Sequence, residues 1–308
     1  MRYAALRAGF PALVLVLLAG CSEDGPPESR ATVEAGEAAA CPGDVLDVVV
    51  SIGAWSDVVR RLGGDCATVT TIAGAPADVP AVVVPADRDA FGAADLVVVN
   101  GARYDEWAAD AAEDAGDAAV VSAAAVAGPS ASRPDPQLWY DPAVVPAVGE
   151  AVTRQLARLS PDAAPYFDAQ HTAWVTELQP WLAAVADLRD DVAGRTCATA
   201  LPAYGPLARA VGLGEGTPRS FLRSVRAGTD PAADDVDAVE ASLRSGSVDV
   251  LVQDADGRGP VHDRLRDVAG ESDVPVVEAT EFPPEDASFV EWQLTQLAAL
   301  AAALDREG

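Results

Sequence analysis

The sequence has 308 residues with 21 basic and 48 acidic side chains, which gives a formal net charge of −27. Half of the residues are apolar, so a disordered chain is excluded. The acidic balance argues against nucleic acid and against anionic lipid surfaces as partners, because both would repel the chain. Two histidines are too few for a histidine-rich metal site. The length suits one large domain or two lobes.

The first 20 residues have the parts of a secretory signal. Arg2 and Arg7 give a positive start, and the apolar run Phe10–Ala19 that follows is too short to span a bilayer as a permanent helix. Cys21 comes directly after a pair of small residues, as in a bacterial lipobox. We therefore predict a lipoprotein signal peptide over residues 1–20 and lipid attachment at Cys21. Ordinary secretion with an incidental cysteine is the alternative.

Residues 21–40 are rich in Ser, Glu, Gly, Pro and Ala and lack apolar periodicity, which predicts a flexible tether. The predicted product is an extracytoplasmic body, lipid-anchored to the cell membrane, and we expect it to be a monomer. Its acidity would hold the body away from the lipid surface.

The remaining cysteines are consistent with an oxidising compartment. Cys41 precedes a predicted strand and Cys66 opens the next one, so both lie at one sheet edge and a Cys41–Cys66 disulfide is geometrically reasonable. Cys197 is then left as a buried thiol in a strand. A metal site built from all three thiolates is the alternative, but the sequence has no C-x-x-C pair.

Residues 41–160 alternate between strand and helix patterns, which predicts an N-terminal α/β lobe with a parallel sheet. Near-continuous β-branched runs are typical of buried parallel strands. We predict strands at Val45–Ile52, Cys66–Ile72, Asp95–Val99 and Ala119–Ala123, with helices at Trp55–Leu62, near Asp87–Ala93, and at Arg103–Ala115.

One Asp-Pro pair and one Ser-Pro pair predict the starts of two helices in the middle of the chain. The first helix should run from Asp141-Pro142 to Leu159. The second should occupy residues 161–194 as a long linking helix, with Pro180 inside it as a kink and Gly194 at its end. A helix of this length can join two lobes as a rigid backbone.

The alternation resumes over residues 195–308, which predicts a C-terminal α/β lobe of similar build. Its predicted strands are Thr196–Leu201, Val248–Gln253 and Pro275–Ala279, and its predicted helices are Tyr204–Val211, the segment from Asp230-Pro231 to about Gly246, Arg258–Ala269 and Pro284–Leu304.

The predicted fold class is therefore α/β, with two lobes that each contain a mainly parallel sheet flanked by helices. Ligands of such open sheets bind at the carboxyl ends of the strands. The loops near 74–85, 135–141, 201–204 and 280–284 should line a cleft between the lobes.

Several stretches in the body resemble the zinc/manganese class of solute-binding proteins of bacterial ABC importers (cluster A-I). Their order and spacing hold from about residue 45 to 304. The matching stretches are Ser51 to Asp57, Leu62 to Asp65, Asp95 to Gly101, Asp135 to Pro142, and the Tyr204-Gly205 helix that leads to Gly212-Leu213.

The resemblance implies four metal ligands, one from each cleft loop. The positions that correspond to the three family ligands in the first three loops are Val79, Gln137 and Leu201, and the carboxylate after the last strand corresponds to Glu281. Val79 and Leu201 offer no donor atom and Gln137 offers only an amide oxygen, whereas zinc needs three or four strong donors. The expected site is thus degenerate, and zinc or manganese is implied by the resemblance alone.

Two acidic residues are candidate substitutes. Asp78 and Asp254 lie next to cleft positions, and with Glu281 they would form an oxygen-only site suited to a hard cation such as calcium or manganese. The alternative is that both side chains are ordinary solvated charges on the surface.

Other residues were weighed in the same way. His171 and His262 match no ligand position and are expected to be structural. Trp139 and Tyr140 border the cleft, where packing is favoured over stacking on a ligand. Arg219, Arg223 and Arg226 are spaced three to four residues apart, which would place them on one face of a helix. There they would either hold an anion or pair with local acids, and pairing is favoured.

The leading hypothesis is a lipid-anchored substrate-binding component that delivers solute to an ABC permease, and not an enzyme. The alternative is a degenerate relative with an accessory or protein-interaction role, or one that binds a non-metal ligand. A collapsed apolar cleft would favour the accessory role. An open polar cleft in which Glu281, Gln137 and Asp254 converge would favour ligand binding.

Overall fold

The computed structural model describes residues 41–74, 85–128 and 135–305. The expected signal peptide, the tether with Cys21, and the positions Asp78 and Val79 all lie outside these ranges. None of the helices in the described ranges is long and apolar enough to cross a membrane.

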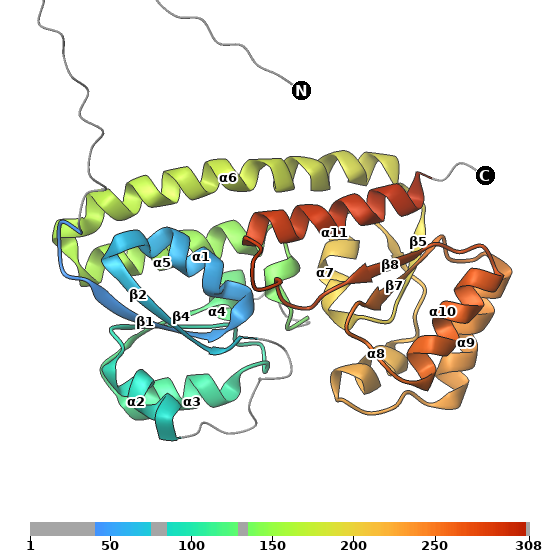
Figure 1. The fold of residues 1–308 in the computed structure, drawn as a ribbon, viewed down its shortest axis with the longest axis horizontal. Helices are drawn as coiled ribbons and strands as arrows, with labels where there is room; N and C mark the ends of the chain where they lie inside the picture. Colours follow the sequence, from blue (N-terminus) through green and yellow to red (C-terminus); the bar gives the residue numbers. More distant parts are fainter. Residues whose placement is uncertain (1–40, 75–84, 129–134, 306–308) are drawn as a thin grey trace, which may run out of the picture. The chain divides into compact units, whose positions relative to one another are not determined.

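The first lobe contains a parallel sheet in the order β2-β1-β3-β4 (Figure 1). Valine-rich runs build β1 and β3, as expected for strands with both faces covered. The strands are β1 Leu46–Ile52, β2 Ala67–Ala73, β3 Leu96–Val99 and β4 Ala119–Ser122.

Side chains of β1 and β3 alternate between the two faces of this sheet. Val48 and Val98 face the cluster that contains helices α1 Ser56–Gly63 and α5 Val144–Leu159. Val49 and Val97 face the other cluster, formed with α2 Pro85–Ala93 and α3 Glu106–Ala115. A short helix, α4 Ala123–Ala127, follows β4.

The second lobe repeats this architecture with a parallel sheet in the order β6-β5-β7-β8. Its strands are β5 Thr196–Thr199, β6 Gly214–Glu215, β7 Val250–Asp254 and β8 Val276–Ala279. Helices α8 Arg219–Arg226, α9 Ala233–Ser245 and α10 Pro260–Glu271 cover one face. Helices α7 Gly205–Ala210 and α11 Phe289–Leu304 pack in the cluster on the other face.

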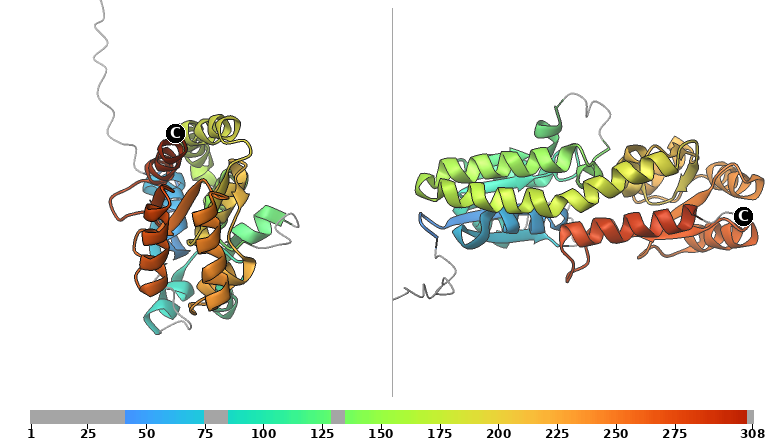
Figure 2. Two further views of the ribbon diagram at one scale, coloured as in Figure 1. Left: turned by 90° about the vertical axis from the view of Figure 1, so that its right-hand side faces the viewer. Right: turned by 90° about the horizontal axis from the view of Figure 1, so that it is seen from above.

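Helix α6, Ala164–Asp191, runs along both lobes and has α11 beside it over the second lobe (Figures 1 and 2). Its 28 residues correspond to a length of about 42 Å. The buried side chains of Phe167, Trp174 and Trp181 face the core, and the rings of Trp181 and Phe289 lie 5.9 Å apart edge to face. Pro180 lies inside α6 without ending it.

One apolar cluster includes residues of β1, α6, β7 and α11 and is therefore shared by the two lobes. The expected α/β architecture of two lobes with parallel sheets and a long joining helix is confirmed.

Several helix starts differ from the expectation. The Asp-Pro pairs lie in the turns before α5 and α9, and Asp141 accepts a hydrogen bond from the backbone of Ala143 in such a turn. The linking helix is preceded by a separate 3-10 turn at Pro161–Ala163. Helix α11 begins at Phe289 rather than at Pro284, because Ser288 and Glu291 form a capping box there. Helix α4 and the two-residue strand β6 are not among the elements predicted from the sequence.

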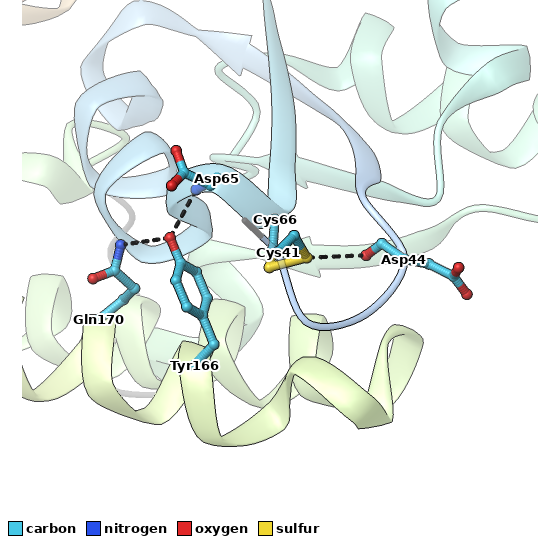
Figure 3. The surroundings of a disulfide bond; sticks show 6 residues. All are labelled: Cys41, Asp44, Asp65, Cys66, Tyr166 and Gln170. Carbon is cyan, nitrogen blue, oxygen red and sulfur yellow. Dashed lines mark hydrogen bonds between the residues drawn. A yellow bond between two sulfur atoms is a disulfide. The ribbon is translucent and has the colours of Figure 1, made fainter. Parts of the chain in front are cut away.

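A disulfide joins Cys41 to Cys66, beside the start of β2 (Figure 3). The Tyr166 hydroxyl of α6 accepts a hydrogen bond from the backbone N–H of Asp65 at 2.8 Å, and the Gln170 amide donates to that hydroxyl at 3.2 Å. The start of β2 is thus fixed to Cys41 covalently and to α6 by the hydrogen bond between Asp65 and Tyr166, whose hydroxyl Gln170 of the same helix orients. Cys197 is a buried free thiol in β5, in the other lobe, so a site made of all three thiolates is excluded.

Candidate functional site

A cavity of about 1090 Å³ lies where loops from both lobes meet. Gln137, Leu201, Asp254 and Glu281 all line it. Asp254 is the last residue of β7, and the other three lie in loops at the carboxyl side of the sheets, where parallel strands bring their following loops together. Four of the sequence-predicted positions are therefore neighbours of one cavity, while Asp78 and Val79 lie outside the described residues.

The loop after β3 has an unusual backbone that brings Tyr104 to this cavity. Gly101, Ala102 and Arg103 have φ values of +73°, +53° and +68°, a conformation that non-glycine residues rarely adopt. The fully buried Asp105 carboxylate stabilises the loop by accepting hydrogen bonds from the backbone N–H groups of Asn100 and Gly101, each at 2.7 Å. The Ser51 hydroxyl donates to the same carboxylate.

Burial raises the pKa of Asp105, while these hydrogen bonds from Ser51, Asn100 and Gly101 oppose the rise. The Asp105 carboxylate therefore stabilises the loop most effectively when it is ionised, because only the ionised form accepts all of its donors.

Asn100 connects this loop to the segment that carries Gln137. Its amide donates to the carbonyl of Pro136, and its side-chain oxygen accepts a hydrogen bond from the Trp55 indole at 3.2 Å. Ser51, Trp55, Asn100 and Pro136 all belong to the stretches on which the family resemblance rests. These four residues build the polar scaffold of the cavity, and Gln137, from one of the same stretches, lines it.

The segment that bears Glu281 is held by aromatic side chains from the loop that carries Gln137. The Trp139 indole donates to the Glu281 carbonyl at 2.9 Å, and the Tyr140 hydroxyl donates to the Thr280 carbonyl. The side-chain oxygen of Gln296 on α11 accepts the backbone N–H of Thr280 at 2.9 Å. Trp139 and Tyr140 are fully buried, so their role is packing and positioning, as favoured from the sequence.

The Glu281 carboxylate is partly occupied by neighbouring donors. The Tyr104 hydroxyl donates to its Oε1 at 3.1 Å and the Gln137 amide donates at 3.3 Å. Burial raises the pKa of Glu281; the hydrogen bonds and Arg226 lower it, while Asp254 adds to the rise. The amide oxygen of Gln137 is buried and has no hydrogen-bond partner among the described residues. An unpaired buried oxygen beside a carboxylate is a place where a cation or a proton donor would be stabilised.

Asp254, at the end of β7, is the second carboxylate of the cavity. Burial raises the pKa of Asp254, and the negative charge of Asp256 adds to the rise. The hydrogen bond from the Asp256 backbone N–H and the positive charges of His262 and Arg258 lower it. The His262 ring lies at the cavity wall with its Nε2 3.1 Å from the Asp254 carbonyl oxygen. His262 is therefore engaged with backbone, and His171 on α6 lies beside Trp174, in neither case at an expected ligand position.

The donor set does not reproduce a transition-metal site. Leu201 is 4% exposed and contributes only apolar surface. No group of three or more His, Cys, Asp or Glu residues that could hold a metal ion occurs within 41–74, 85–128 and 135–305. What the cavity offers is oxygen from Glu281, Asp254 and Gln137, which suits hard cations better than zinc.

Of the three arginines weighed in the sequence, only Arg226 pairs with an acid in the described part of the chain. It contacts Asp135 at 2.7 Å, and Arg209 of α7 binds the other oxygen of the same carboxylate at 2.9 Å. Arg226 is therefore paired, but with an acid 91 residues away in the sequence rather than with the local acid that was expected. Arg219 and Arg223 have no ion pair with any described residue.

The fold and the family model agree on the class of protein. The model described as "Zinc-uptake complex component A periplasmic" (ZnuA) matches residues 48–303, so the chain belongs to this family of zinc/manganese-type solute-binding proteins.

Individual relatives are more distant. Over 172 residues the chain is 28% identical to the manganese-binding lipoprotein MntA of Halalkalibacterium halodurans, and this match covers 54% of each protein. The chain thus spans about half the length of this curated relative.

Two solved structures share the fold. The periplasmic zinc-binding protein TroA from Treponema pallidum matches with a TM-score of 0.73 and 19% identity, over 85% of this chain and 99% of that one. FpvC from Pseudomonas aeruginosa, solved in complex with Mn²⁺, matches with a TM-score of 0.70 and 19% identity, over 85% and 100%.

Proposed function

We propose that this protein is the lipid-anchored, extracytoplasmic substrate-binding component of an ABC importer, and that it captures its solute in the cavity between the lobes. The observation that supports this best is the cavity itself: it is open, and Gln137, Asp254 and Glu281 all line it. A degenerate accessory protein would be expected to have a collapsed apolar cleft instead.

The oxygen donors favour a hard divalent cation as the solute. Glu281 and Asp254 supply carboxylates of raised pKa, and cation binding would relieve the cost of burying their charge. The unpaired Gln137 oxygen would complete its bonding in the same way. Manganese and calcium accept such ligands, whereas zinc prefers imidazole and thiolate donors. No thiolate lines the described cavity, and its imidazole, His262, has Nε2 3.1 Å from the Asp254 carbonyl oxygen.

A second candidate is a non-metal solute. Arg226 lines the cavity and interacts electrostatically with Glu281, so part of the negative charge available to a cation is already compensated. Leu201 adds an apolar wall. A small organic molecule with one cationic or hydrogen-bonding end would use both features.

The test is metal binding to the chain from Ser22 to Gly308, which leaves out the signal and the lipid but keeps the compact unit Ala40–Gly308. After chelator treatment, zinc, manganese and calcium are titrated in turn by calorimetry, with thermal melting in parallel. We expect one-to-one binding of manganese or calcium. A ligand at 100 times its dissociation constant adds about 2.7 kcal/mol to the free energy of unfolding.

Two variants make the result specific. Glu281→Ala should abolish binding, while Glu285→Ala, an exposed acid in the same loop, should leave it unchanged. If none of the three metals binds or raises the melting temperature, the metal proposal fails and the organic solute becomes the one to test.

The lipid anchor is tested separately from the solute. Mass spectrometry of the protein expressed in a bacterial host should find the mature chain beginning at an acylated Cys21, and Cys21→Ser should move it from the membrane fraction to the soluble one. A mature N-terminus at any other residue would contradict the anchor.

A further inference from the structure

A second cavity, of about 1030 Å³, lies next to the solute cavity and has a different lining. Four arginines line it: Arg209 from α7 and Arg219, Arg223 and Arg226 from α8. Gln137, Asp254 and Glu281 are not part of its wall. Arg223 and Arg226 lie on the boundary, because they also line the first cavity.

Arg219 and Arg223 are exceptional within the described ranges. With Arg88, they are the arginines there whose side chains form neither an ion pair nor a hydrogen bond with a described residue. The chain has 48 acidic side chains against 21 basic ones, so an arginine without an acidic partner is not expected by chance pairing. Their spacing of four residues places them one above the other on α8, where like charges repel.

The acidic groups of this cavity are already engaged. Asp135 binds Arg209 and Arg226 with one oxygen each. Asp141 accepts the backbone N–H of Ala143 at 2.9 Å, and Glu215 accepts that of Thr217 at 2.8 Å. Even counted at full charge, the three acids leave the four arginines in excess, in a protein whose net charge is −27.

Adjacent guanidinium groups at a concave surface are the arrangement that binds oxyanions, because each group donates two parallel hydrogen bonds to a carboxylate or phosphate. A doubly charged anion would also remove the repulsion between the two arginines. The cavity volume is that of a small-molecule site, and its remaining wall includes apolar residues such as Leu138, Val144 and Leu222.

We propose that this cavity is a second binding site, distinct from the solute cavity, for a small molecule that carries a doubly charged oxyanion, either a phosphate group or paired carboxylates. Arg219 and Arg223 hold the anion, and the pair Arg209 and Arg226 on Asp135 forms the adjoining wall. The site does not depend on the identity of the solute in the first cavity.

The experiment titrates the mature, lipid-bearing protein in detergent with inorganic phosphate and, separately, with succinate. Ionic strength is held constant with sodium chloride, so that general screening is the same at every point. We expect saturable one-to-one binding of at least one of the two anions, and the comparison shows whether the site prefers phosphate or paired carboxylates.

Three variants locate the binding. Arg219→Gln/Arg223→Gln should weaken it at least about tenfold, since the variant loses the charge-assisted hydrogen bonds of both guanidinium groups. Arg154→Gln/Arg158→Gln removes the same charge at the same spacing from α5 and should have no effect. Glu281→Gln should also leave anion binding intact, which separates this site from the solute cavity.

Absence of saturable binding by both anions would overturn the proposal. So would equal weakening in the two double-arginine variants, because that would show a general effect of net charge. Each variant is checked for an unchanged melting temperature; the four substituted arginines are exposed, so no loss of folding is expected.

Discussion

Removal of the Cys41–Cys66 disulfide gives a sharp test of how the first lobe is stabilised. The bond closes a loop with a sequence separation of 25 residues. In the chain-entropy model, a loop of this length destabilises the unfolded state by about 3.5 kcal/mol at 25 °C. Cys66 is fully buried, so replacement of both residues by alanine avoids placing a buried hydroxyl at that position.

The assay is urea unfolding followed by tryptophan fluorescence. For a urea dependence of about 3 kcal/mol per molar, the Cys41→Ala/Cys66→Ala variant should unfold at a urea concentration about 1 M lower than the oxidised protein. Reduction of the unmodified protein should produce a similar shift, and the same reductant should leave the variant unchanged.

The reasoning would be refuted by a midpoint shift below about 0.2 M in both the reduced protein and the variant. In that case the hydrogen bond between the Asp65 backbone and Tyr166 would be sufficient to fix the start of β2 without the covalent bond.

Three further predictions concern the cavity and the core. Burial raises the pKa of Glu281 above the ordinary glutamate value of 4.5. Its contribution to the free energy of unfolding is therefore fully present below pH 4.5 and is lost as the pH rises through the folded-state pKa. Glu281→Gln should lack that loss when unfolding is measured across this pH range, and parallel stability curves for the two proteins would contradict it. Gly149→Ala should destabilise the protein by about 1–3 kcal/mol, since the added carbon would lie 2.2 Å from the Trp174 ring, whereas Gly270→Ala in α10 meets no atom within 4 Å and should be neutral or stabilising in the same denaturation assay. Asp135→Asn should cost about 1–2 kcal/mol by breaking two partly exposed ion pairs, and the difference from the unmodified protein, measured by melting, should shrink at high salt.

The strands and the two-lobe architecture were predictable because their signals are local and strong. β-branched runs such as those of β1 and β3 have few alternatives to a buried parallel strand. Helix starts were less certain: an Asp-Pro pair favours a turn as well as a helix, and Asp141 uses its side chain in the turn. The pattern of α8 is short and strongly charged, so its three arginines suggested a shared face without fixing the boundaries of a helix.

The candidate site shows a different limit. That Gln137, Leu201, Asp254 and Glu281 line one cavity follows from the order of strands in two parallel sheets. Tyr104, which donates to Glu281, was not predicted.

We expected a helix from Arg103 onward, so the backbone conformation of that loop was not predicted. Nothing in the residue types of Ala102 and Arg103 indicates a positive φ. Asp105 stabilises that backbone from within the fold, through hydrogen bonds that only the folded chain brings together.

The apolar cluster shared by the two lobes has a mechanical consequence. Since β1, α6, β7 and α11 contribute to one cluster, the lobes cannot separate widely without exposing side chains such as Trp181 and Phe289 to water. Opening the cavity by separating the lobes would therefore break the same contacts that keep the chain folded. The backbone amides that exchange their hydrogens most slowly should accordingly be distributed over both sheets and α6. Solute release should proceed through small local displacements of the loops at the cavity rim, without separation of the two lobes.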